Sequence, residues 1–246
     1  MSPKSTSVRR CSLLLGLLAL AVSSSATTFD AFTDFQIASN SSTNTWSYWS
    51  DGTTNLTNYN SMIVLMPTPS LDCGFGTSCW FNAADNSVIL QNATGSVANF
   101  LDGGAAPNGL LTYYPRLSTS VIRFTAPSSG TYSISGDFNT LSSSPSPTQF
   151  AVVLNGTTFL DDSSSLGSFP FSSVLSLSSG NTLDFIVAGG DCSNSGCNQS
   201  ATSFDATLSN STAPVPEPET LLLLVSGLFG LGGVIRKKLL TEQPGM

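Results

Sequence analysis

Short apolar runs separated by turn residues fill the chain between about residues 27 and 210. The runs are rich in Val, Ile, Phe, Tyr and Thr, and clusters of Gly, Ser, Asn and Pro bound them, as is typical of β-strands. No segment sustains the 3.6-residue period of an amphipathic helix. Strands are predicted at residues 61–66, 87–91, 110–114, 120–126, 130–138, 149–156, 157–160, 182–190 and 202–209.

Several of these runs alternate with the two-residue period of a half-buried strand. Tyr132, Ile134 and Gly136 fall on one face of their strand, and Leu183, Phe185 and Val187 do so in theirs. The sequence Asn155-Gly156 between two runs is a strong hairpin signal. About nine or ten strands of this kind predict an all-β, jelly-roll-like β-sandwich, with one domain over residues 27–209.

The N-terminal segment has a different pattern. Basic residues at Lys4, Arg9 and Arg10 precede the apolar run CSLLLGLLALAV, and the small residues SSSA follow. This order predicts a helical secretory signal peptide over residues 1–26, cleaved before Thr27. An uncleaved anchor is the other interpretation, although the run is short for a bilayer core of roughly 30 Å.

The C-terminal segment is apolar from Leu221 to Ile235 and then basic at Arg236, Lys237 and Lys238. As a helix it reaches about 22 Å, and the basic cluster places its end on the cytoplasmic side as a membrane stop. We expect a linker at residues 210–219 and one short transmembrane helix within 220–246. This helix is either a permanent anchor or a processed sorting tail.

The stretch VPEPETLLLLVSGLFGLGGVIRKK resembles a PEP-CTERM sorting signal, in which a Pro-Glu-Pro tripeptide precedes a short Leu/Gly-rich span and a basic cluster. The resemblance implies an exosortase-type enzyme that recognises Pro216, Glu217 and Pro218 and removes the tail. It also implies a place in an exopolysaccharide or biofilm matrix. The chain departs from the pattern in extending from Leu239 to Met246 beyond the basic cluster.

The body also resembles a jelly-roll module of exported bacterial proteins that often carry such tails. The similarity lies in WSYW at 46–49, YYP at 113–115, VIRFTAPSSGTYSISGDF at 121–138, VVLNGTTFLDD at 152–162 and the segments around 180–209. Many members have LHP where this chain has YYP. The resemblance implies a fold but no particular activity.

Charge and composition exclude several classes of function. Residues 27–213 contain twelve Asp, no Glu, two Arg and no Lys, so their net charge is −10 (2 − 12). A body without a basic patch does not suit nucleic acid. The chain has no histidine, which excludes a Ser-His-Asp or Cys-His nucleophile and the zinc sites that use histidine.

The cysteines agree with export. Cys11 leaves with the signal peptide, and four remain. Cys73 with Cys79, and Cys192 with Cys197, would each close a small disulfide loop in an oxidising compartment. A four-thiolate metal site is the alternative, but neither pair has the C-x₂-C spacing of a zinc ribbon.

The aspartates raise two kinds of chemistry. A glycan hydrolase needs two facing carboxylates; Asp161 and Asp162 are neighbours that point to opposite faces of a strand. Asp184, Asp191 and Asp205 are candidates to converge near the last strands. Calcium is the metal that oxygen ligands from Asp and Asn side chains would suit. Its candidate ligands are Asp161, Asp162, Asp191 and Asn194. Solvated turns are the simpler interpretation of the same residues.

Aromatic residues offer a third kind of site, because exposed rings can stack on sugars. The candidates are Trp46, Tyr48, Trp49 and Tyr113. Trp46 and Tyr48 share one strand face and Trp49 has the other, so one face is predicted to be core and the other exposed. Core packing is the common fate of large aromatic residues in sandwiches.

These observations predict an exported, non-catalytic protein of the cell surface or exopolysaccharide matrix, with carbohydrate binding as a candidate activity. The alternatives are a carboxylate-dependent glycan hydrolase and a permanently membrane-anchored surface domain. No cofactor is expected, with calcium as the one candidate. The expected partners are an exosortase-type enzyme, the inner membrane at least transiently, and exopolysaccharide. The body is expected on the outer side of the inner membrane and, after processing, at the cell surface or in the matrix.

Overall fold

A computed structural model describes residues 26–51, 64–99, 105–115, 118–141, 148–162, 167–188, 201–211 and 226–227. Ser25–Ala213 form one compact unit, and Met1–Ser24 with Pro214–Met246 form a second. In the second unit only Ser226 and Gly227 are described, and both are helical. The described part of the first unit is built of β-strands and turns, so the predicted all-β fold is confirmed.

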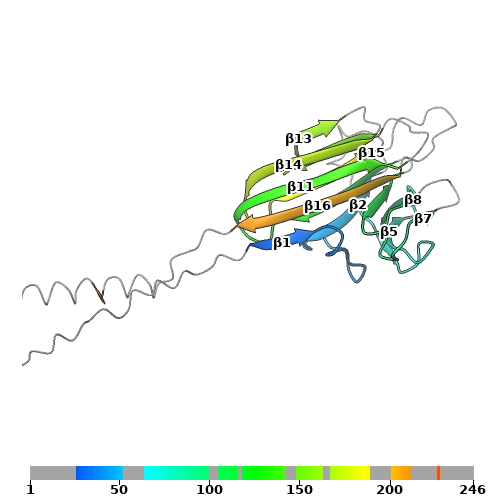
Figure 1. The fold of residues 1–246 in the computed structure, drawn as a ribbon, viewed down its shortest axis with the longest axis horizontal. Helices are drawn as coiled ribbons and strands as arrows, with labels where there is room; N and C mark the ends of the chain where they lie inside the picture. The colour runs from blue at the N-terminus through cyan, green and yellow to red at the C-terminus, as the bar shows by residue number, and fades with distance from the viewer. Residues whose placement is uncertain are drawn as a thin grey trace, which may run out of the picture. The chain divides into compact units, whose positions relative to one another are not determined.

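The larger sheet has eight antiparallel strands in the order β14-β11-β16-β9-β6-β5-β4, with β1 paired to β16 beside this path (Figure 1). Its strands are β1 (Thr27–Asp30), β4 (Thr68–Ser70), β5 (Ser78–Asn82), β6 (Ser87–Gln91), β9 (Leu111–Tyr114), β11 (Gly130–Thr140), β14 (Ser168–Leu177) and β16 (Thr202–Ser211).

The second sheet has six strands in the order β13-β12-β15-β10-β2-β3. Its strands are β2 (Trp46–Asp51), β3 (Val64–Leu65), β10 (Thr119–Thr125), β12 (Gln149–Leu154), β13 (Thr157–Asp162) and β15 (Thr182–Ala188). A separate short pair is formed by β7 (Ala98–Asn99) and β8 (Ala105–Ala106). Some neighbours, such as β5 with β6 and β12 with β13, follow each other in the chain, whereas others, such as β11 with β16 and β2 with β10, come from distant parts of it, as in a sandwich with crossing connections.

The two large sheets pack through their inner faces, and aromatic rings fill the space between them. Phe138 on β11 stacks on Phe150 on β12 with ring centroids 5.2 Å apart, and Phe185 on β15 lies 5.2 Å from Phe204 on β16. All four side chains are fully buried. The predicted alternation is confirmed, because Tyr132 and the Leu183–Val187 face belong to this core whereas the side chains next to Tyr132 on β11 are exposed.

Gly136 allows a close contact between neighbouring strands of the larger sheet. Gly136 on β11 lies opposite Phe171 on β14 and Ala206 on β16. A Cβ atom at this position would overlap the Phe171 ring and the backbone oxygen of Asp205. Because Gly136 has no side chain, the Phe171 ring can pack directly against its backbone.

Local turn chemistry also follows the sequence. Asn155 and Gly156 join β12 to β13 with φ values of 48° and 80°, and a two-residue hairpin loop of the I′ type requires two such left-handed residues. The Asn155 side-chain oxygen accepts a hydrogen bond from the Thr182 amide over 2.9 Å, so the turn is also tied to β15.

The ten-residue strand β14 was not predicted, although its core-facing positions are apolar in four of five cases. Phe169, Phe171, Leu175 and Leu177 alternate with Ser and Pro residues. Pro170 and the serines weaken the strand signal of this segment. The strand forms because β14 lies at the end of the sheet order, where the missing amide of a proline disrupts no ladder on the outer side. The short strands β1, β4, β5, β7 and β8 were also missed.

The domain ends slightly later than predicted. β16 continues to Ser211, which pairs with Thr131, and Asn210 pairs with both Thr27 and Tyr132. The first two residues of the expected 210–219 linker therefore belong to the sandwich. The predicted disulfide between Cys73 and Cys79 is present and closes the loop between β4 and β5.

Several predictions lie outside the described residues. They are the signal peptide except for Ala26, the Pro216–Pro218 tripeptide, the basic cluster 236–238, and the pair formed by Cys192 and Cys197. In the part of the chain that is described, no helix has the length and apolar character needed to cross a membrane.

Candidate functional site

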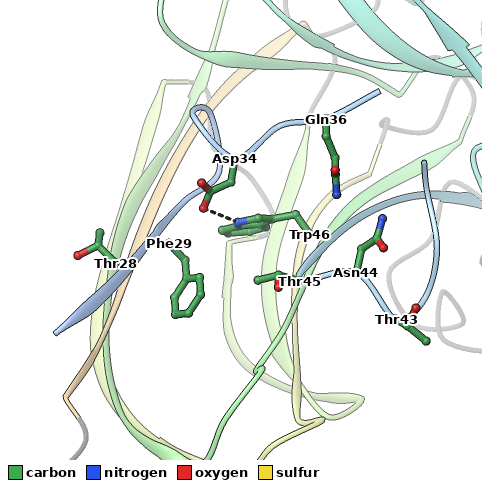
Figure 2. A pocket seen from close by; sticks show the side chains of 8 residues that line it. All are labelled: Thr28, Phe29, Asp34, Gln36, Thr43, Asn44, Thr45 and Trp46. Atoms are coloured by element: carbon green, nitrogen blue, oxygen red, sulfur yellow. Dashed lines mark hydrogen bonds between the residues drawn. The ribbon is translucent and has the colours of Figure 1, made fainter. Parts of the chain in front are cut away.

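A pocket of about 600 Å³ lies between β1 and the start of β2 (Figure 2). Two segments close in sequence build it, namely the end of β1 with the turn that follows, and the residues that lead into β2. Its lining comprises Thr28, Phe29, Asp34, Gln36, Thr43, Asn44, Thr45 and Trp46.

The turn after β1 is fixed by two aspartates. Asp30 Oδ1 accepts the backbone amides of Phe32 and Thr33 at 3.1 and 2.7 Å. Asp34 Oδ2 accepts the Asp30 amide at 2.9 Å and the indole Nε1–H of Trp46 at 3.3 Å. The Trp46 indole is buried in the core, so its N–H holds the Asp34 carboxylate at the pocket wall, as Figure 2 shows.

The opposite wall carries amides and hydroxyls. Asn44 donates from Nδ2 to the backbone oxygen of Ser39 at 2.9 Å, which orients its amide. The side chain of Gln36 is exposed, while its backbone oxygen accepts the Trp80 indole N–H at 2.8 Å. The pocket therefore combines a carboxylate, two amides and three threonines with the edge of an aromatic core. Its lining contains no basic side chain.

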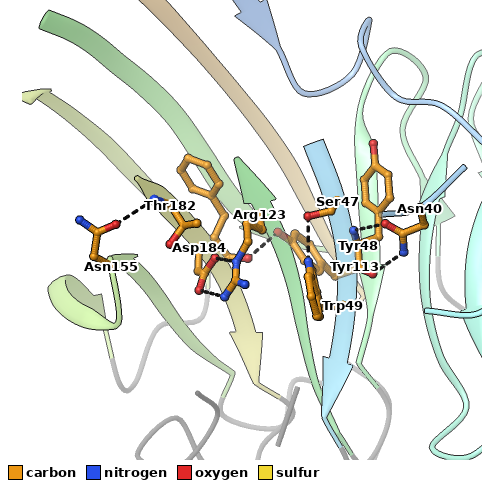
Figure 3. A network of polar contacts seen from close by, with 10 residues as sticks. Asn40, Ser47, Tyr48, Trp49, Tyr113, Arg123, Asn155, Thr182 and Asp184 are labelled. Carbon is orange, nitrogen blue, oxygen red and sulfur yellow. Dashed lines mark hydrogen bonds and ion pairs between the residues drawn. The ribbon is translucent and has the colours of Figure 1, made fainter. Parts of the chain in front are cut away.

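A second polar feature lies on the outer face of the six-stranded sheet (Figure 3). Arg123 on β10 forms a two-point ion pair with Asp184 on β15, with Nε–Oδ1 at 2.5 Å and Nη2–Oδ2 at 2.7 Å. The guanidinium carbon lies 4.9 Å from the ring centroid of Trp49 on β2, and the Trp49 Nε1–H donates to Ser47 Oγ at 2.8 Å. The Asp184 side chain is only 1% exposed and that of Arg123 is 16% exposed, which suits a structural ion pair.

Asn40 completes the network on the other side of β2. Its amide donates to the backbone oxygens of Tyr48 and Met66 at 2.6 and 3.2 Å, and its Oδ1 accepts the Tyr48 amide at 3.0 Å. The Asn40 side chain thus bonds both backbone groups of Tyr48, in the middle of β2, as a neighbouring strand would. This contact fixes residues 36–45, which form one wall of the pocket, against the sheet.

The structure corrects most of the predicted sugar-stacking set. Trp46, Tyr48 and Tyr113 are 2%, 0% and 0% exposed and belong to the core between the sheets. Side chains of both sheets cover their rings, so no sugar can stack on them in this structure. Trp49 has the opposite face, as predicted, and is partly exposed, but the Arg123 guanidinium lies over its ring.

The expected convergence of carboxylates is also corrected. Asp184 alternates with the core residues Leu183 and Phe185 and lies on the outer face of the six-stranded sheet. Asp205 alternates with Phe204 and Ala206 and lies on the outer face of the eight-stranded sheet. The two carboxylates thus lie on opposite sides of the sandwich, because each belongs to a different sheet. Asp191 lies outside the described residues.

The predicted calcium site stays a prediction, because only Asp161 and Asp162 of its four candidate ligands belong to the described residues. Asp161 is exposed on β13 and Asp162 follows it in the same strand, while Asp191 and Asn194 lie outside the described residues. Within the described ranges, no three Asp, Glu or Cys side chains are placed to share a metal ion.

Of the residues that line the pocket, only Trp46 was singled out from the sequence. Phe29, Asp34, Gln36 and Asn44 come from two segments whose patterns show only a short strand and a polar loop. The two aspartates four residues apart in TTFDAFTDF, Asp30 and Asp34, were a weak signal, since Asp is a common turn residue.

Comparison with protein families gives one match. Residues 214–237 match the model of the PEP-CTERM protein-sorting motif. The chain carries a PEP-CTERM sorting signal. This signal implies an exported protein that is membrane-anchored before processing, with an exosortase-type enzyme as the processing partner. The motif begins three residues after β16 ends at Ser211.

No curated protein sequence matches the chain. Among solved structures, the C-terminal CBM6 of LamC, a marine laminarinase from Zobellia galactanivorans, is similar at 16% identity and a TM-score of 0.26, covering 51% of this chain and 100% of the module. CBM35 from Paenibacillus barcinonensis is similar at 16% identity and a TM-score of 0.26, covering 76% and 99%. Rabbit GITRL is similar at 10% identity and a TM-score of 0.27, covering 38% and 73%. The TM-scores of the two carbohydrate-binding modules and of GITRL lie at 0.26–0.27, and such scores transfer no function to the PEP-CTERM protein.

Proposed function

We propose that this PEP-CTERM protein is an exported, non-catalytic protein of the cell surface or exopolysaccharide matrix. The observation that carries the proposal is the sorting motif at residues 214–237, which follows directly on a self-contained sandwich. In this proposal an exosortase-type enzyme recognises Pro216, Glu217 and Pro218 and removes the membrane-spanning tail. Export places the body on the outer side of the inner membrane. Removal of the tail then lets it reach the cell surface or the extracellular matrix.

The end of the sandwich supports this order of events. β16 pairs with β1 on one side and with β11 on the other up to its last residues. The described strand pairs of β16 end at Ser211, so removal of the tail after Pro218 would take away none of them. The prolines after Ser211 favour an extended backbone, which a processing enzyme can reach.

Polysaccharide is the partner class that we propose for the body. The body has a net charge of −10 by sequence (2 − 12), and one of its two arginines, Arg123, is held in a buried ion pair. Such a surface disfavours anionic polymers and favours neutral ones. The separation of Asp184 and Asp205 onto opposite faces supports binding over a hydrolysis that would use these two carboxylates.

The test is the intact mass of the protein recovered from its native host, in membrane and released fractions. Processing predicts a mature chain that begins near Thr27 and lacks Leu221–Met246. Replacement of Pro216, Glu217 and Pro218 by Ala should leave the full tail and keep the protein in the membrane fraction. A wild-type mass that retains Leu221–Met246 would reject processing and leave a permanently anchored surface domain.

A further inference from the structure

We propose that the pocket between β1 and β2 binds one unit of a neutral saccharide chain. The proposal rests on the proposed function only in its choice of polysaccharide as the partner class. The pocket's volume of about 600 Å³ lies within the roughly 300–1,000 Å³ range of small-molecule sites. The side chains that line the pocket determine the class of ligand that it suits.

The apolar wall of the pocket is rigid. Phe29 is partly buried, and its ring lies 5.3 Å from that of Phe124 and 6.3 Å from that of Tyr132, measured between centroids. Phe124 in turn packs edge-on against Trp46 at 5.2 Å. Figure 2 shows the Phe29 ring beside the hollow. A ring held in this way offers a preorganised apolar surface to the C–H face of a sugar.

The polar wall has hydrogen-bonding capacity left over. Asp34 uses Oδ2 for the Asp30 amide and the Trp46 indole, and its Oδ1 accepts no hydrogen bond from the described residues. Asn44 uses Nδ2 toward Ser39, and its Oδ1 is likewise unused within the described part of the chain. Both groups are oriented by the contact they do make, so the remaining acceptors point in fixed directions. Gln36 adds an exposed amide with both a donor and an acceptor.

Charge selects among ligands that offer hydroxyl groups. The lining holds the carboxylate of Asp34 and no Lys or Arg, and Asp30 lies behind the same turn. An anionic ligand would meet the Asp34 carboxylate, with that of Asp30 close behind it, and no cation in the lining to pair with. Neutral hydroxyl groups donate well to carboxylate and amide oxygens and accept from amides and threonine hydroxyls. A neutral sugar meets these requirements together with the apolar wall.

The experiment measures binding by calorimetry with the mature protein recovered from its host. The probes are the host's own exopolysaccharide, neutral oligosaccharides of glucose, galactose and mannose, and polygalacturonate as an acidic chain. We expect a neutral probe to bind and polygalacturonate to bind at least about tenfold more weakly, a difference of roughly 1.4 kcal/mol. The intact mass of the same sample reports on tail processing independently, so failure of the sorting proposal and failure of this one are distinguishable.

Two variants locate the site. Gln36→Ala removes an exposed amide and is expected to weaken binding by about fivefold, and Thr43→Trp places a large ring at the exposed rim and is expected to abolish it. Asn139→Ala, an exposed amide on the outer face of β11, is the matched control and should bind as the wild type does. The proposal is overturned if no neutral probe binds the wild-type protein, if polygalacturonate binds best, or if Thr43→Trp binds like Asn139→Ala.

Discussion

The hydroxyl of Tyr113 on β9 donates a hydrogen bond to the backbone oxygen of Phe185 on β15 over 2.9 Å. The bond crosses the core and joins the eight-stranded sheet to the six-stranded sheet. Both side chains are fully buried, and burial raises the pKa of Tyr113 well above its ordinary value. The hydroxyl therefore remains a donor throughout the physiological pH range.

Tyr113→Phe should lower the free energy of unfolding by about 1 kcal/mol, because a buried hydrogen bond is lost with little change in volume. Urea denaturation of both proteins measures the difference. Tyr48→Phe is the matched control: the Tyr48 hydroxyl is equally buried but has no hydrogen-bond partner in the described structure. Its removal should leave stability unchanged or raise it. An equal loss in both variants would contradict the assignment of the bond between the sheets.

The Arg123–Asp184 pair should be costly to break from one side. Arg123→Ala leaves the carboxylate of Asp184, which is 1% exposed, without its guanidinium, and losses of about 3 kcal/mol are typical of such changes. Replacement of both residues, as Arg123→Met with Asp184→Leu, should cost clearly less than the single change. Thermal unfolding of the two variants and the wild type gives this comparison. If Arg123→Ala cost under about 1 kcal/mol, the pair would be a solvent-screened surface contact.

Gly136→Ala should strongly destabilise the sandwich. The added methyl group would overlap the Phe171 ring and the backbone oxygen of Asp205, and overpacking of this kind costs about 1–3 kcal/mol or more. Ser135→Ala, at the adjacent exposed position of the same strand, is the control and should change stability little. The midpoints of urea unfolding test the pair of variants. Similar midpoints for both would mean that the strands can separate to admit the methyl group.

Asp205 should destabilise the fold at neutral pH. It lies directly opposite Asp137 in the β11–β16 ladder, and burial, with repulsion from Asp30 and Asp137, raises its pKa. A carboxyl whose pKa is raised by folding favours the folded state below its unfolded pKa and loses that contribution as the pH rises through the folded pKa. Asp205→Asn should therefore add about 0.2–1 kcal/mol of stability at pH 7.

The pH dependence separates this effect from a general change in packing. The gain from Asp205→Asn should disappear near pH 3, where the carboxyl is protonated in both states. Asp161→Asn is the control, since Asp161 is exposed and lies opposite Ala151; it should give a smaller gain at pH 7. Unfolding curves at the two pH values supply the test. A gain from Asp205→Asn that is the same at pH 3 and pH 7 would exclude charge as its cause.

Features that depend on a few adjacent residues could be predicted from the sequence. The alternation around Tyr132 and Ile134 assigns their faces because successive side chains of a strand point to opposite sides. The Asn155-Gly156 turn follows from the left-handed backbone that those two residues accept. The Cys73–Cys79 disulfide closes a loop short enough to be recognised locally. The sorting signal is likewise a linear motif, so it required no fold at all.

Features that depend on which strands become neighbours were decided by the tertiary structure. Trp46, Tyr48 and Tyr113 had the composition of a sugar platform, but the packing of the two sheets against each other buries them. Asp184 and Asp205 are near in sequence, yet they belong to different sheets and lie on opposite faces. The pocket exists because Asn40 and the Asp34–Trp46 contact hold a loop against β1 and β2. Sheet order is set by pairing between distant segments, and a local pattern of apolar and polar residues carries no record of that pairing.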